Sequence, residues 1–264
     1  MKHIIFASYG NDSIALIQWA REKGLDDVHV AYSDTGWAAP FWAERVDRCE
    51  AWVRSLGFTH HRIESEGMRS LVERKKGWPR QGYQYCTTHL KLEPAKAWLA
   101  EHDPEGEAVC LVGIRRAESR ARRAFPEWTE DSDNHGGRTL WAPLVRFSDE
   151  DRDKLLRRAG FEPLPHRSQE CYPCVNANRG DIRLLTEARI ADIEAFETAL
   201  GFTSKGKPRT MFRPYRHQGA SGIREVAKWA NSERGQYQPL VVLGQGGCDS
   251  GMCEAGGGEG GENE

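Results

Sequence analysis

A short run of small and polar residues, SYGNDS at positions 8–13, follows the apolar stretch HIIF and precedes a segment with helical spacing. The N-terminus of a helix offers unpaired N–H groups and the positive end of its dipole, so this turn could hold a phosphate or sulfate group. Its glycine would let the backbone approach closely, its serines supply hydroxyl donors, and its aspartate could hold a magnesium ion. An ordinary turn capped by the asparagine or the aspartate explains the same residues. The candidate residues are Ser8, Tyr9, Gly10, Asn11, Asp12 and Ser13.

Cysteines form the second group of reactive residues. Cys171 and Cys174 flank Pro173 in a C-x-x-C pattern, a turn spacing that lets two thiolates reach one metal ion. Zinc, an iron–sulfur cluster and a redox-active dithiol remain open from this spacing alone. Cys49 and Cys110 stand in a helix-like and a strand-like apolar segment, so we expect them to be buried core residues.

Cations follow the predicted end of a strand in the stretch RRAESRARR at 115–123. Because guanidinium groups bind phosphate and sulfate through paired hydrogen bonds, we expect some of them to face an anion. Arg120 and Arg123 are expected to lie on a solvated face instead. Lys91 stands near the start of a predicted helix and could reach a phosphate or lower the pKa of a neighbouring thiol. The alternative for Lys91 is a solvated helix lysine.

Five strand-like segments alternate with helix-like segments along the first part of the chain. This alternation predicts an α/β fold with a mainly parallel five-stranded sheet and helices on both faces. Ligands bind beyond the carboxyl ends of the strands in such sheets, and the polar groups at 8–13, 34–36 and 115–122 follow predicted strand ends. The predicted strands are 3–8, 27–36, 58–65, 107–114 and 138–145, and the predicted helices are 12–24, 40–57, 68–77, 90–102, 149–160 and 179–201.

Composition divides the chain of 264 residues into three parts. We expect an α/β domain at 1–185, a helical or irregular extension at 186–243, and a flexible glycine-rich tail at 244–264. The net charge of −2 hides basic segments at 115–125 and 209–217. These segments favour local anion sites over a uniformly basic nucleic-acid-binding surface.

No apolar run is long enough to span a membrane, and the start MKHIIFASYG lacks the features of a signal peptide. We therefore expect a cytoplasmic protein without membrane contact. Seven cysteines without a secretory signal argue against a disulfide framework and for metal binding or thiol chemistry. The sequence leaves open whether the chain forms oligomers.

SYGNDS resembles the SGGKDS-type PP-loop of the adenine-nucleotide alpha-hydrolase superfamily, which includes ATP pyrophosphatases and sulfonucleotide (PAPS) reductases. Tyr9 replaces a glycine, and Asn11 replaces the lysine of the ATP-cleaving members, which removes a charge that would stabilise leaving pyrophosphate. The C-T-x-x-L-K pattern that begins at Cys86 is most similar to that of the DNA-phosphorothioation members. Five further blocks resemble the family in matching order: SDTGW (33–37), YCTTHLKLEP (85–94), GIRRAESRARR (113–123), WAPLVRFSDED (141–151) and ECYPCVNA (170–177).

This resemblance implies a HUP-type, Rossmann-like fold that binds an adenine nucleotide, either ATP with Mg²⁺ or a sulfonucleotide. It implies catalytic roles for Asp12, Lys91, Arg116 and Cys253. It also implies nucleotide contacts from the turn residues given above and from Asp34, Thr35, Gly113, Arg115, Arg116, Glu118 and Arg122.

In the cluster-bearing reductases the C-x-x-C pairs with an upstream double cysteine, of which this chain has only Cys86. The resemblance implies a 4Fe-4S cluster held by Cys86, Cys171, Cys174 and Cys248, with zinc as the alternative metal. The tail cysteines Cys248 and Cys253 have three interpretations: a nucleophile that attacks a sulfonate sulfur, a cluster ligand, and unused thiols in a flexible segment.

Three functions remain open at this point. The first is ATP-dependent sulfur transfer to a nucleotide or to a nucleic acid, DNA or RNA, with a cysteine desulfurase as the sulfur donor. The second is a sulfonucleotide reductase that releases sulfite and takes electrons from thioredoxin. The third is a nucleotide- or nucleic-acid-binding protein that has a structural metal and no catalytic activity.

Overall fold

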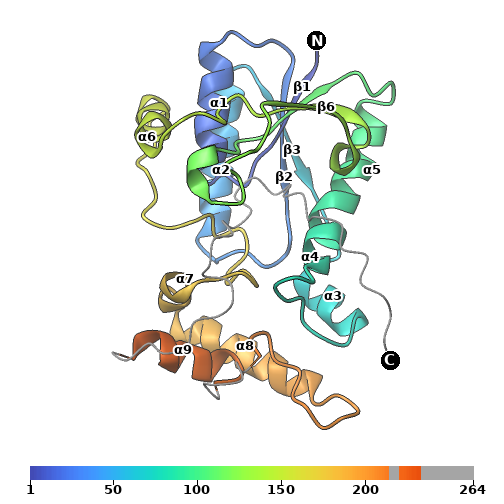
Figure 1. The fold of residues 1–264 in the computed structure, drawn as a ribbon, viewed down its shortest axis with the longest axis vertical. Helices are drawn as coiled ribbons and strands as arrows, with labels where there is room; N and C mark the ends of the chain where they lie inside the picture. Colours follow the sequence, from blue (N-terminus) through green and yellow to red (C-terminus); the bar gives the residue numbers. More distant parts are fainter. Residues whose placement is uncertain (214–219, 233–264) are drawn as a thin grey trace.

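A six-stranded sheet forms the centre of the molecule in the computed structural model, which describes residues 1–213 and 220–232. Its strand order is β3-β2-β1-β4-β6-β5, and every neighbouring pair except β5–β6 is parallel. Helices cover both faces of the sheet (Figure 1). The strands are β1 His3–Phe6, β2 Val28–Ser33, β3 Thr59–Ile63, β4 Val109–Leu111, β5 Trp128–Ser132 and β6 Arg138–Trp141.

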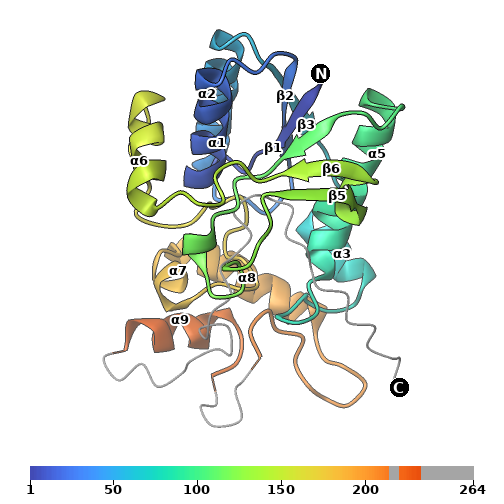
Figure 2. The ribbon, with the colours of Figure 1, turned by 45° about the horizontal axis from the view of Figure 1, so that its top comes forward.

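The helices α1, α2 and α6 lie on one side of the sheet and α5 lies on the other, whereas α7, α8 and α9 lie together beyond the carboxyl ends of the parallel strands (Figures 1 and 2). Short 3₁₀ turns η2 (Arg116–Glu118) and η3 (Asp133–His135) flank β5. The remaining elements are α1 Asn11–Glu22, α2 Trp42–Ser55, α3 Met68–Arg74, α4 Tyr85–Thr87, η1 Thr88–Leu92, α5 Glu93–His102, α6 Asp149–Arg158, α7 Arg179–Arg183, α8 Glu187–Leu200 and α9 Ile223–Asn231.

Two apolar clusters cover the two faces of the sheet because side chains alternate along each strand. Ile5 belongs to the larger cluster together with Ile14 of α1, whereas Ile4 belongs to the smaller cluster together with Leu99 of α5. All four of these side chains have no exposed surface. The expectation that Cys49 and Cys110 are core residues is confirmed, since neither is exposed.

The predicted α/β fold with a mainly parallel sheet is confirmed, and each of the five predicted strands contains an observed one. The sixth strand, β5, runs antiparallel at the edge of the sheet and was not expected. Its sequence WTEDS lacks the apolar alternation of a half-buried strand. Position at the edge explains this composition, because charged residues on an edge strand discourage pairing with other chains.

The helical segments differ from the expectation in two places. The predicted helix 179–201 is divided into α7 and α8, since Thr186 begins a new helix by accepting a hydrogen bond from the Arg189 N–H at 3.2 Å. The helical segment expected at 90–102 begins earlier, at Tyr85, and passes through the π-helical turn η1. Lys91 lies in this turn.

The extension beyond residue 185 joins the core of the α/β domain. Ile193 of α8 and Ile223 of α9 belong to the same apolar cluster as the residues on α1. The buried Glu197 carboxylate accepts hydrogen bonds from the Met211 N–H (2.8 Å) and the Ile223 N–H (3.0 Å), which fixes the start of α9.

The expected tail at 244–264 lies outside the described residues, and the three-part division of the chain stays a prediction. Within the described part of the chain, no helix has the length and apolar character needed to cross a bilayer.

Candidate nucleotide and thiol site

The turn at 8–13 joins β1 to α1 and is buried. The Gly10 N–H donates to Ser8 Oγ at 3.3 Å, and Ser13 Oγ donates to the Gly10 carbonyl at 3.2 Å. A Cβ atom on Gly10 would lie 3.0 Å from the Cβ of Ser168. The segment that contains Ser168 therefore covers this side of the α1 N-terminus.

Tyr9 occupies the position that resembles a glycine of related loops, and it has a φ of 56°, a conformation that favours glycine. Its ring is buried and stacks on Tyr32, with 5.7 Å between the ring centroids. Its carbonyl oxygen accepts a hydrogen bond from Arg45 Nε at 2.8 Å. The tyrosine thus anchors the turn in the core, and these contacts hold it in the unfavourable backbone conformation.

Asn11 binds a distant part of the backbone with both ends of its side-chain amide. Asn11 Nδ2 donates to the Leu164 carbonyl at 3.0 Å, and the Leu164 N–H donates to Asn11 Oδ1 at 2.9 Å. The side chain of Asn11 is used in this pair, so its backbone is the part available to a ligand. Nucleotide contact by Asn11 stays a prediction.

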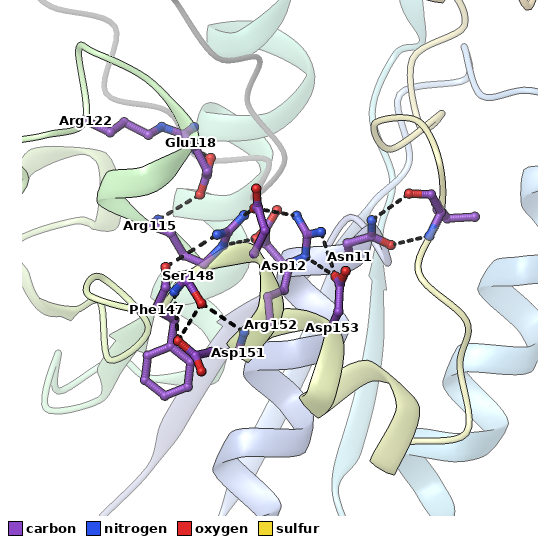
Figure 3. Close-up of polar contacts among 12 residues, drawn as sticks. Asn11, Asp12, Arg115, Glu118, Arg122, Phe147, Ser148, Asp151, Arg152 and Asp153 are labelled. Carbon is purple, nitrogen blue, oxygen red and sulfur yellow. Dashed lines mark hydrogen bonds and ion pairs between the residues drawn. The ribbon is translucent and has the colours of Figure 1, made fainter.

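Asp12 forms a buried ion pair with Arg115, which follows β4 (Figure 3). Arg115 Nε donates to Asp12 Oδ1 at 2.5 Å, and Arg115 Nη2 donates to Asp149 Oδ1 at 2.9 Å. Burial alone would lower the pKa of Arg115, but the two carboxylates outweigh burial and raise it. The guanidinium is therefore charged and ties the turn at 8–13 to the loop after β4 and to the start of α6.

Gly113 lies directly against the backbone of Asp12. A Cβ atom at this position would be 3.0 Å from the Asp12 carbonyl oxygen and 3.1 Å from its carbonyl carbon. This close approach explains why a residue without a side chain stands between β4 and Arg115, since backbone atoms cannot move aside as the end of a side chain can.

Replacing Gly113 by alanine is expected to lower the free energy of unfolding by about 1–3 kcal/mol, because the added methyl group overpacks the contact. Urea denaturation of the full chain measures this change. Gly77→Ala is the matched control, since a Cβ atom added there would meet nothing within 4 Å and its φ is ordinary. Equal stability of the two variants would contradict the close approach at Gly113.

The other polar residues after β4 bind one another and their own loop. Arg116 donates from Nε (3.0 Å) and Nη2 (2.8 Å) to the carbonyl oxygen of Phe125. Glu118 accepts from the Arg115 N–H at 2.7 Å and forms an ion pair with Arg122. These side chains shape the loop, and their predicted contacts with a nucleotide stay predictions. Arg120 and Arg123 are exposed, as expected.

The segment after β2 reaches the other half of the site. Asp34 is exposed, and its carboxylate accepts a hydrogen bond from the Gly36 N–H at 2.8 Å. Thr35 is buried, and its hydroxyl donates to the Glu170 carbonyl at 3.0 Å and lies 3.8 Å from Cys171 Sγ. Thr35 thus connects the carboxyl end of β2 to the C-x-x-C segment.

A small cavity of about 60 Å³, the thiol cavity, brings together three of the predicted cysteines. Cys86, Cys171 and Cys174 line it, together with Lys91 and Glu170. Lys91 is buried, and its Nζ forms an ion pair with the equally buried Glu170 carboxylate. The interpretation of Lys91 as a solvated helix lysine is therefore wrong.

Burial and the neighbouring charges determine the protonation of this group. Burial raises the pKa of the Cys171 and Cys86 thiols to about 12, and the Lys91 ammonium opposes this effect in both. Burial would lower the pKa of Lys91, but the charge of the Glu170 carboxylate and its hydrogen bond oppose burial, and the pKa is raised. At neutral pH the Cys86 and Cys171 thiols are therefore protonated and lie beside a closed Lys91–Glu170 ion pair.

A complete metal site is absent from residues 1–213 and 220–232, where no group of three or more histidine, cysteine or acidic side chains is arranged to hold an ion. The remaining predicted ligand, Cys248, and the predicted nucleophile, Cys253, lie outside the described residues. Asp12, the predicted magnesium ligand, is paired with Arg115. These residues do not by themselves fit a 4Fe-4S cluster or a magnesium ion.

A second cavity, of about 510 Å³, lies beside the turn at 8–13, and we call it the turn cavity. Asn11 and Asp12 line it from α1, and Arg152 lines it from α6. The two cavities have Arg167, Ser168 and Asp181 in common, so they adjoin each other. Pockets of 300–1,000 Å³ accommodate most small ligands and cofactors.

Sequence reasoning missed several residues that line the site. Glu170 immediately precedes the C-x-x-C, and this adjacency is the one local signal that could have identified it. Arg167 pairs with Asp181 at 2.5 Å and lies between the cavities, but neither belongs to a block that indicated a site. Arg152 belongs to a charged helix in which no single arginine stands out.

A mainly parallel α/β sheet, a buried polar turn after its first strand and a ligand-sized cavity beside that turn are features of many nucleotide-binding folds. The chain belongs to the phosphoadenosine phosphosulfate reductase domain family, whose family model matches residues 2–174.

Relatives of this chain include two phage proteins. It is 28% identical over 192 residues to an uncharacterized 37.8 kDa protein of Escherichia phage 186, covering 64% of this chain and 58% of that protein. It is 23% identical to an uncharacterized nin region protein of Escherichia phage lambda, covering 96% of this chain and 93% of the relative. An uncharacterized protein of Methanocaldococcus jannaschii is 30% identical over 42% of this chain and 22% of that protein. The chain thus spans little more than half of the phage 186 protein.

A solved structure with a similar fold is that of phosphoadenylyl-sulfate (PAPS) reductase from Candida auris in a phosphate complex. The TM-score is 0.44 at 13% sequence identity, and the match covers 62% of this chain and 75% of the reductase.

Proposed function

We propose that the protein binds an adenine nucleotide in the turn cavity and transfers sulfur at the thiols of the adjoining cavity. The observation that carries this proposal is the shared wall of Arg167, Ser168 and Asp181 between the two cavities. A nucleotide in the turn cavity would have its phosphate end beside Asn11 and Asp12. Its reacting group would then lie next to the shared wall, and the thiols lie on the other side of that wall.

The chain's own residues have separable roles in this proposal. The N-terminus of α1 would bind a polyphosphate or sulfonate in the turn cavity, and Arg152 and Arg167 would exchange their carboxylate partners, Asp153 and Asp181, for this anion. Asn11 provides no charge where related ATP-cleaving loops have lysine, so these arginines would take over the stabilisation of leaving pyrophosphate. Lys91 favours thiolate formation at Cys171 and Cys86.

The proposed transfer proceeds in three balanced steps. ATP adenylates an oxygen of the acceptor and releases pyrophosphate. A persulfide on one cavity thiol, charged by a desulfurase-type donor, attacks the atom that carries this oxygen, and AMP leaves with the oxygen. The outer persulfide sulfur is now bonded to the acceptor. A second thiol then attacks the cysteine sulfur and breaks the persulfide's sulfur–sulfur bond, which releases the thiolated acceptor and leaves a protein disulfide for an external dithiol such as thioredoxin to reduce.

A sulfonucleotide reductase is the second candidate, favoured by the family match and by the absence of a lysine at Asn11. In this reaction a thiolate attacks the sulfonate sulfur of adenylyl sulfate or its 3′-phosphate, and the nucleotide leaves with the bridging oxygen. A second thiol attacks the first cysteine sulfur, so sulfite leaves with the bonding electrons and the two cysteines become oxidised to a disulfide.

Product analysis of the full chain distinguishes the candidates. With ATP, Mg²⁺, a persulfide donor and an oligonucleotide acceptor, we expect pyrophosphate, AMP and thiolated acceptor. Because adenylation precedes sulfur transfer, Cys171→Ser is expected to keep pyrophosphate release and to lose at least about 90% of the thiolated product, whereas Cys49→Ala, in the core, keeps both. Sulfite release from a sulfonucleotide without pyrophosphate formation would establish the reductase instead. Nucleotide binding without any product would exclude both enzymes.

A further inference from the structure

A basic and aromatic surface adjoins the thiol cavity, and nothing in the proposed chemistry uses it. We call it the rim surface and define it by Lys75, Lys76, Arg80, Tyr83 and Arg213. It continues directly into the cavity wall, since the chain leads from Tyr83 to the lining residues Gln84 and Cys86.

Three cations of the rim surface are exposed and lack a carboxylate partner among the described residues. Lys75, Lys76 and Arg80 are exposed and form no ion pair within the described part of the chain, whereas their neighbour Arg74 is paired with Glu66. Arg213 comes from the basic segment 209–217 and lies near Arg80. Burial, followed by the charge of Arg80, lowers the pKa of Arg213.

A preformed aromatic platform stands among these cations. The Tyr83 ring is exposed at 59%, and the Arg80 guanidinium lies 5.9 Å from its centroid. Paired backbone hydrogen bonds between Arg80 and Tyr83, of 3.1 and 2.9 Å, close a tight turn. The Tyr85 ring meets Tyr83 edge-on at 5.6 Å, and its hydroxyl is fixed to the Gly77 carbonyl. The exposed ring is therefore held in place by packing before any partner binds.

We propose that the rim surface binds a single-stranded nucleic acid and presents it to the thiol cavity as the sulfur acceptor. Phosphates suit the cations around Arg80, and the exposed face of Tyr83 suits stacking by an unpaired base, a combination typical of single-strand binding. The bases of a duplex are stacked on one another and cannot use this ring. An acidic peptide would use the cations alone. The role as acceptor site rests on the proposed function, whereas the binding itself does not.

Fluorescence anisotropy with labelled 12-nucleotide single strands of DNA and RNA tests the binding in the full chain. Tyr83→Ala is expected to weaken binding about 5- to 100-fold, and Tyr83→Phe to preserve it, because the ring supplies the stacking. Lys76→Ala and Arg80→Ala are each expected to lower the slope of log affinity against log salt by about 0.7, the value for one phosphate contact on a single strand.

Arg120→Ala combined with Arg123→Ala is the matched control, since these exposed cations belong to the other basic segment. The proposal is overturned if this control loses as much affinity as the rim variants, if the rim variants bind as the unchanged chain does, or if a duplex or polyglutamate binds as tightly as a single strand. Calorimetry with ATP and adenylyl sulfate on the same variants keeps the two proposals apart. If the protein binds the oligonucleotide but neither ATP nor adenylyl sulfate, the proposed function is refuted and the proposed nucleic-acid binding is not.

Discussion

Replacing Arg115 by methionine is expected to lower the free energy of unfolding by about 3–5 kcal/mol, a large share of the stability of a typical domain. The side chain of Arg115 is 1% exposed, and that of its partner Asp12 is 4% exposed. Methionine fills a similar volume but leaves the Asp12 carboxylate buried without a countercharge. Urea denaturation at neutral pH measures the loss, and calorimetry with ATP tests whether the proposed nucleotide binding at the turn 8–13 survives the change.

Two further variants separate the lost charge pair from altered packing. Adding Asp12→Asn to Arg115→Met removes the unpaired charge and is expected to recover much of the stability, which a double-mutant cycle reports. Arg158→Met is the matched control, because the Arg158–Glu22 ion pair has similar geometry (2.6 and 2.8 Å) but is solvated, and such pairs contribute about 0–1 kcal/mol. A loss below about 1 kcal/mol in Arg115→Met would mean that water reaches Asp12.

The strands of the sheet could be predicted because burial on both faces selects short apolar runs such as HIIF and VHVAYS. The edge strand β5 could not, since its backbone pairing with β6 does not require apolar side chains. The interruption before Thr186 was also missed. The Thr186 hydroxyl caps the start of α8. Packing, rather than the local sequence, decides whether this segment forms one continuous helix or two helices.

The site was predicted as separate residues rather than as pairs. Asp12 and Arg115 were both expected near a nucleotide, and the structure joins them in an ion pair beyond the carboxyl ends of the neighbouring strands β1 and β4. The pairing of the Asn11 amide with Leu164 and that of Lys91 with Glu170 have no periodic signal in the sequence, since each depends on how distant segments meet. Resemblance indicated which residue types gather at the site, but the partner of each buried polar group follows only from the fold.

Replacing Lys91 by methionine is expected to have two effects with different causes. The free energy of unfolding should fall by about 3–5 kcal/mol, because the Glu170 carboxylate remains buried without its countercharge. The thiols should also react more slowly, because the ammonium that favours their thiolates is absent. Denaturant unfolding reports the first effect, and the rate of alkylation by iodoacetamide at Cys171, followed by mass spectrometry on metal-free protein at pH 8, reports the second.

Glu170→Gln distinguishes the charge of Lys91 from general damage to the cavity. The Glu170 carboxylate raises the pKa of the Cys171 thiol less than burial does, and its removal leaves the opposing Lys91 charge in place. Alkylation of Cys171 should therefore be faster in Glu170→Gln and slower in Lys91→Met, although both variants break the same ion pair. Damage to the fold would expose the thiol and accelerate alkylation in both. Slower alkylation in Lys91→Met alone thus assigns the effect to the ammonium, and equal rates in both variants would refute a role of Lys91 in thiol activation.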